Sequence, residues 1–150
     1  MTIAQTATTS FKVELPQGIH NFGPTSPDTF KIALYTAAAD LGPATTAYNP
    51  AAAGQVVGTG YVIGGNTLSI SVSPVAGNNA LNIPTSYWSF FNTSWANATF
   101  TARGALIYNL TKSNRSVAVL DFGADKTVNN DTFQIIFPAP DANSAIIRIS

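Results

Sequence analysis

Apolar and polar residues alternate one by one along much of this chain, which is the spacing of a β-strand with one buried face. The alternation is clearest in Thr67–Ser73, where aliphatic residues alternate with serines, and it recurs in Phe11–Leu15 and Thr29–Thr36. No segment of helical length has the spacing of an amphipathic helix. We therefore expect strands at these positions and no more than short helical turns.

Glycine and proline residues separate the apolar runs at short intervals, as turns between strands do. The triplet Gly64-Gly65-Asn66 lies between two strand-like runs, Gln55–Ile63 and Thr67–Ser73, and predicts a hairpin there. Further strand-like runs are Tyr87–Trp95, Ala98–Tyr108, Ser116–Phe122 and, after a polar loop, Thr132–Phe137 and Ala145–Ile149. Roughly eight to ten short strands result, and this pattern predicts an all-β, single-domain β-sandwich or jelly roll.

The first nine residues are small and polar, and we expect them to form a flexible N-terminal arm. The β-sandwich domain then spans residues 10–150, an ordinary size for one domain. Residues 37–54 are rich in alanine, but their prolines and glycines exclude a long helix.

Charged residues make up only 9% of the chain, and seven basic residues balance seven acidic ones. Binding of nucleic acid depends on clustered Lys and Arg residues, so we expect no such partner. A net charge near zero favours association, and we expect a homo-oligomer, a dimer or trimer. Because no apolar run has the length of a membrane span and no signal peptide is visible, we expect no membrane partner and synthesis in a cytoplasm.

Candidate catalytic residues are scarce, because cysteine is absent and His20 is the only histidine. A hydrolytic triad needs a histidine base, but His20 lies in a Gly/Pro-rich loop without a carboxylate close by, and we interpret it as solvent-exposed. Asp121 and Asp125 are the best candidates for a glycosidase pair, although aspartates that follow a strand usually belong to turns. We expect no enzymatic activity, no cofactor and no metal.

An aromatic cluster between Tyr87 and Trp95 is the best candidate for a partner-contact surface. One strand face cannot bury all of these rings, so we expect some to pack in the core and the others to form an interface or a platform for sugars. Arg103 interrupts an apolar run just before Gly104, and it points either toward a partner or toward Asp121. The candidate partner contacts are Tyr87, Trp88, Phe90, Phe91 and Arg103.

Two sequence blocks, Ala98–Asn109 (ATFTARGALIYN) and Ala118–Gly123 (AVLDFG), resemble those of small structural proteins of tailed bacteriophages. Weaker similarity extends over roughly residues 28–150, including Phe30–Thr36 and Gly58–Leu68. The resemblance implies a virion component, in the first place a jelly-roll-like capsid decoration, or cement, protein. Such a protein binds major capsid protein subunits and stabilises the assembled head shell, because it binds that state alone. The alternative is a tail or fibre module that binds a host surface glycan.

Overall fold

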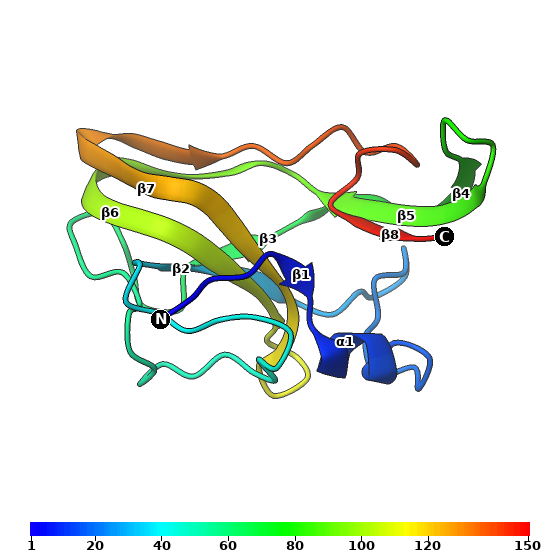
Figure 1. The fold of residues 1–150 in the computed structure, drawn as a ribbon, viewed down its shortest axis with the longest axis horizontal. Coiled ribbons are helices and arrows are strands. Elements are labelled where there is room, and N and C mark those ends of the chain that lie inside the picture. Colours follow the sequence, from blue (N-terminus) through cyan, green and yellow to red (C-terminus); the bar gives the residue numbers. More distant parts are fainter.

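The computed structural model describes all 150 residues, Met1–Ser150, as two antiparallel sheets that form a sandwich (Figure 1). One sheet has the strand order β1-β7-β6-β2-β3 and the other β4-β5-β8. The elements are β1 (Thr6–Ala7), α1 (Thr9–Glu14), β2 (Phe30–Tyr35), β3 (Asn66–Leu68), β4 (Ile70–Asn78), β5 (Pro84–Phe90), β6 (Thr93–Asn109), β7 (Arg115–Ile135) and β8 (Ile147–Ile149). The prediction of an all-β sandwich is confirmed, whereas a division into five and three strands does not establish a jelly roll.

The longest elements, β6 and β7, form a two-stranded ribbon of 17 and 21 residues. In Figure 1 the ribbon crosses the molecule, bends at its far end and returns above itself. Register shifts interrupt the pairing near Asn97 and Asn130, and both residues have left-handed backbone, with φ angles of 50° and 49°. Because such bulges bend a strand, one ribbon can follow both layers of the sandwich.

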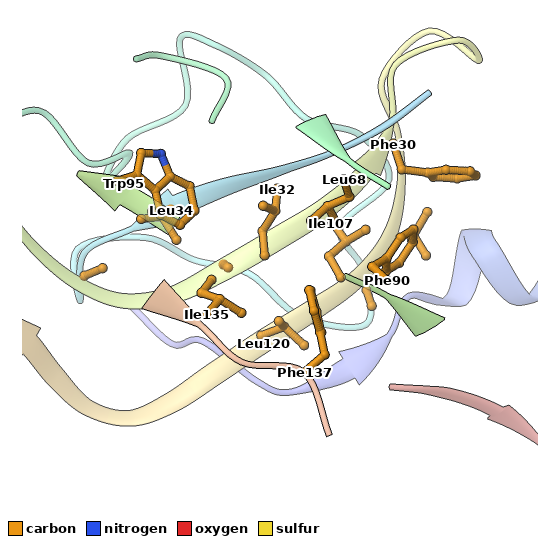
Figure 2. Packing of buried hydrophobic residues seen from close by; sticks show 14 of the residues in the cluster. Phe30, Ile32, Leu34, Leu68, Phe90, Trp95, Ile107, Leu120, Ile135 and Phe137 are labelled. Atoms are coloured by element: carbon orange, nitrogen blue, oxygen red, sulfur yellow. The ribbon is translucent and has the colours of Figure 1, made fainter. Parts of the chain in front are cut away.

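The main core lies between the two layers (Figure 2). The larger sheet contributes Phe30, Ile32 and Ile107, and the smaller sheet contributes Trp88 and Phe90. Each fully buried side chain of this size contributes about 1.5–3 kcal/mol of transfer free energy. Both sheets therefore depend on the same buried cluster.

Strand β2 is confirmed, and the face predicted to be buried, which carries Phe30, Ile32 and Leu34, is in the core. Its opposite face is buried as well, because the connection from β2 to β3 folds over it. Tyr35 lies there in a second apolar cluster with Leu41, Tyr48 and Tyr108. β2 is thus a central strand with two buried faces.

The strand predicted at Phe11–Leu15 is wrong, because this segment forms helix α1. Thr8 caps the helix, and its side-chain oxygen accepts a hydrogen bond from the Phe11 N–H at 3.4 Å. Phe11 and Glu14 are buried on one helical face, whereas Val13 is exposed. α1 has six residues, and no helix of the structure is long and apolar enough to cross a membrane.

Residues 1–9, which the sequence predicts as a flexible arm, lie against the domain in the structure. Thr6 and Ala7 form β1 and pair with β7, and Ile3 is bridged to Leu41. The Thr8 side chain is buried and its hydroxyl lies 2.8 Å from that of Ser116. The segment is attached through backbone and hydroxyl hydrogen bonds, which a hydrophobic pattern does not reveal.

The hairpin predicted around Gly64-Gly65-Asn66 does not form. Gln55–Ile63 is a loop, β3 pairs with β2, and β4 pairs with β5. Gly65 has a φ angle of 71°, and a Cβ atom there would lie 1.8 Å from the Ile32 carbonyl oxygen. Gly65 therefore allows the loop to approach β2 closely. Gly64 lies in a turn in which the Gly65 N–H donates to the Val62 carbonyl at 2.9 Å, but this turn does not join two paired strands.

Candidate functional site

Trp88 and Phe90, two of the five candidate partner contacts, are core residues with an exposed fraction of 2% each, so their side chains present almost no surface to a partner. β5 is the central strand of the smaller sheet, and its inner face has to fill the space between the layers. The Trp88 ring lies 5.2 Å from that of Phe22. The Trp88 indole Nε1–H is buried without a hydrogen-bond partner.

The other three predicted contacts keep accessible surface. Phe91 is 60% exposed, and Tyr87 and Arg103 are partly exposed. Arg103 takes the second of its two predicted orientations, since its Nε donates to Asp121 Oδ1 at 3.3 Å. Phe91 is therefore the aromatic residue of this cluster that remains most available to a partner.

His20 is buried, with a side-chain exposed fraction of 0%, so its interpretation as a solvent-exposed residue is wrong. Its Nε2 donates to Glu14 Oε2 at 2.7 Å, and its Nδ1 accepts from Asn109 Nδ2 at 3.0 Å. This tautomer is assigned from the partners, because Asn109 Nδ2 also donates to Asp28 Oδ2 at 2.8 Å. The Lys112 N–H donates to Asn109 Oδ1 at 3.1 Å, which fixes the orientation of the amide.

Two basic residues complete this buried polar network. Arg115 Nη1 donates to Glu14 Oε1 at 2.6 Å, and Lys112 Nζ lies 3.9 Å from Asp28 Oδ1. A carboxylate–histidine pair also occurs in hydrolytic triads, but there the second ring nitrogen contacts a nucleophile. Both nitrogens of His20 are occupied by Glu14 and Asn109. The network therefore ties α1 and the following loop to the β6–β7 turn.

Asp121 pairs with Gly104 just before a bulge of β7 and Asp125 lies at the end of that bulge, and the two have different surroundings. The four residues Phe122–Asp125 of β7 lie opposite the single residue Arg103 of β6. The Gly123 backbone N–H, 2.9 Å from Asp121 Oδ1, holds the pKa of that carboxyl below its ordinary value, and Arg103 acts in the same direction. A general acid of a glycosidase needs a raised pKa, so Asp121 does not fit that role.

A groove of about 690 Å3 runs along the outer side of β7, within the range of about 300–1,000 Å3 typical of ligand sites. Its apolar lining consists of Phe122, Val128, Phe133, Ile135 and Ile136. Its polar lining consists of Asp125, Lys126, Thr127, Asn129, Asp131, Thr132 and Gln134. Asp125, one of the two predicted glycosidase residues, thus lines the groove, and Asp121 does not.

The groove is open because the outer half of β7 lacks a neighbour on one side. β1 pairs with β7 only at Ala118 and Val119, whereas β6 continues along β7 as far as Ile135. Backbone N–H and C=O groups on this free edge face solvent. The sequence pattern missed the site because the bulges break the alternation, and the segment before Thr132 reads as a polar loop.

Exposed apolar residues also occur on the loop that follows Gln55. Val57 is 83% exposed and Val62 is 75% exposed. The loop is held against β6, since the Thr99 N–H donates to the Thr59 carbonyl at 3.0 Å. A Cβ atom at Gly58 would lie 2.4 Å from the Thr99 carbonyl oxygen, so the two backbones are in close contact. The loop therefore holds its two exposed valines in a fixed position against β6.

The tip of the β4–β5 hairpin is a second exposed apolar feature. Leu81 is 78% exposed and Ile83 is also exposed. Asn79 Oδ1 accepts hydrogen bonds from the N–H groups of Leu81 and Ile83, at 2.9 and 3.0 Å. Asn143 Oδ1 accepts a further bond from the Ala80 N–H at 2.6 Å. These bonds hold the tip in one conformation.

No family model, curated protein or solved structure matches this chain. No group of three His, Asp or Glu side chains gathers where it could hold a metal ion.

Proposed function

We propose that this chain is a structural protein of a tailed-bacteriophage virion, in the first place a decoration protein that binds major capsid protein subunits of the assembled head. The observation that carries the proposal is the position of the two apolar features. The loop with Val57 and Val62 packs on the far end of β6, and the β4–β5 tip with Leu81 lies at the opposite end of the long axis (Figure 1).

A protein that joins two neighbouring subunits needs two contact surfaces on one rigid body. Both features are held by hydrogen bonds within the chain, so little conformational entropy is lost when they bind. Burial of apolar surface contributes about 25 cal/mol per Å2. If only the assembled shell presents both contacts, binding stabilises the assembled state by mass action.

The internal structure of the chain also favours a mechanical role. The two blocks that resemble phage structural proteins pair with each other, since residues from Gly104 to Ile107 of β6 face Asp121 to Ala118 of β7. The two paired blocks form part of the larger sheet, and under this proposal the loops determine which partner is bound. His20 and Asp121, the residues closest to catalytic chemistry, are bonded to Asn109 and Arg103.

Self-association is part of this proposal, as a dimer or trimer. Phe91 and Ile136 are both strongly exposed, and the Phe137 N–H donates to Asn92 Oδ1 at 2.9 Å, which brings the two segments together. A shared interface would cover this apolar surface. Replacement of Phe91 by Ser should weaken the oligomer without unfolding the chain, as measured by sedimentation.

The test of shell binding uses cosedimentation of purified protein with undecorated shells of the parent phage. The double variant Val57→Thr/Val62→Thr keeps side-chain shape but loses apolar surface, and we expect binding weakened at least about tenfold. Leu81→Asn should have a similar effect at the other end. Val13→Thr, on the exposed side of α1, is the matched control. Equal binding of all variants would contradict the two-ended contact.

A further inference from the structure

We infer that the groove along β7 is a binding site for a neutral carbohydrate. The proposed shell contacts at Val57, Val62 and Leu81 do not use this surface, and only Ile136, at one end of the groove, also belongs to the proposed self-association surface. The inference therefore goes beyond the proposed function and holds for a head or a tail position. The groove combines a partly exposed aromatic floor, carboxylate and amide groups on the rim, and a strand edge with free hydrogen-bonding groups.

The floor of the groove offers two rings, Phe122 and Phe133, with centroids 6.2 Å apart. Both are partly buried, so part of each ring remains accessible. Phe133 is supported from behind by Phe100 at 5.1 Å and by Trp95 at 6.0 Å. A pyranose ring has an apolar face of C–H groups, which packs on such a rigid aromatic surface.

The rim supplies polar groups that suit hydroxyls. Asp125 and Asp131 form no ion pair, and Asp131 Oδ1 accepts only a local bond, from the Thr132 N–H at 2.7 Å. Carboxylates accept from two neighbouring hydroxyls, and amides such as that of Gln134 both donate and accept. A sugar with an apolar face and a polar rim matches both parts of the groove.

The charge of the groove favours a neutral ligand. Asp125 and Asp131 against Lys126 leave two negative charges and one positive charge, a net charge of −1. Sulfated, phosphorylated or uronic acid residues would meet this negative charge at short range. We therefore assign the site to neutral hexoses or N-acetylhexosamines.

Another β-strand is a poorer occupant, because the free edge carries features that oppose strand addition. Lys126 and Asp131, which pair with Ala102 and Ala98 of β6, are exposed charged residues along the edge strand. The bulges at Phe122–Asp125 and Asn130 also bend the edge. Charged side chains on an edge strand and bulges are the usual protection against edge-to-edge pairing.

The test is a titration of 15N-labelled protein with maltohexaose, cellopentaose and triacetylchitotriose, followed by NMR. We expect saturable shifts of amides between Phe122 and Ile136 with at least one of these sugars. Asp131→Asn and Phe122→Leu should each weaken binding about tenfold, because one removes a charged acceptor and the other the aromatic face. Asp40→Asn, at an exposed aspartate outside the groove, should bind like the wild type.

Several outcomes would overturn the site: no saturable shift with any of the three sugars, shifts confined to other parts of the chain, or equal binding of a sulfated oligosaccharide. Line broadening of the amides from Phe122 to Gln134, beyond the proposed self-association surface at Ile136, that grows with protein concentration alone would show that a second copy covers the groove. None of these outcomes affects the shell-binding test, because that test depends on Val57, Val62 and Leu81.

Discussion

The network around His20 and the groove along β7 both contain carboxylate, amide and lysine side chains. In the network these groups bond to one another, whereas in the groove they are open to solvent. In the network, Glu14 and Asn109 occupy both nitrogens of a histidine that solvent does not reach. In the groove, Asp125 and Asp131 face solvent without a cationic partner. A carboxylate–histidine pair in a loop therefore indicates function only when one of its groups is free to contact another molecule.

The largest expected effect on the free energy of unfolding is that of Asn109→Ala. The side chain is fully buried, and its loss leaves the His20 Nδ1 and the Asp28 carboxylate without their shared donor. We expect the free energy of unfolding to fall by about 3–5 kcal/mol, because the side chain makes three hydrogen bonds and each buried group left without its partner costs about 1–3 kcal/mol. Urea denaturation measures this change. A decrease of less than about 1 kcal/mol in the free energy of unfolding would show that the network does not stabilise the fold.

A smaller effect is expected for Glu14→Gln, which keeps the shape of the side chain and removes its charge. Glu14 accepts from both His20 and Arg115, so the change weakens two charge-assisted bonds. We expect a loss of about 1.5–3 kcal/mol in the free energy of unfolding. Asp40→Asn is the control, and an equal effect of the two changes would remove the distinction between buried and exposed carboxylates.

The stability of the chain at alkaline pH tests a second buried region, the tyrosine cluster beneath the β2–β3 connection. Burial raises the pKa of Tyr35 and Tyr108 above the ordinary value, and nearby tyrosines raise each pKa further. Their neutral forms are favoured in the folded state, so stability is complete below the unfolded pKa of about 10 and decreases as pH rises beyond it. The tyrosinate absorbance of Tyr35 and Tyr108 should appear only together with unfolding. Ionisation of all five tyrosines of the chain before unfolding would refute this.

The smallest effect on stability is expected in the groove. Asp125→Asn and Asp131→Asn should change the free energy of unfolding by less than about 0.5 kcal/mol, because neither aspartate is buried or ion-paired. The same urea titrations measure both. A destabilisation comparable with that of Glu14→Gln would mean that the groove is a structural feature and that the contrast with the network is wrong.

The fold was more predictable from the sequence than the candidate site. The alternation in Phe30–Tyr35 identified β2, because a strand that faces the core carries its large side chains at every second position. The His20 network was not predictable, since His20 and Asn109 are 89 residues apart and meet only in the folded chain. The groove was not predicted from the sequence, because bulges at Phe122–Asp125 and Asn130 interrupt the two-residue alternation by which strands are identified.

The central claim, a decoration role in a virion, is tested most directly by the copy number of this chain in purified particles of the parent phage. Quantitative mass spectrometry gives the ratio of this chain to the major capsid protein. The proposed role predicts a ratio fixed by the sites of the shell lattice, together with loss of the chain when the heads are absent. A few copies per particle that remain with isolated tails would contradict it and favour the glycan-binding tail module.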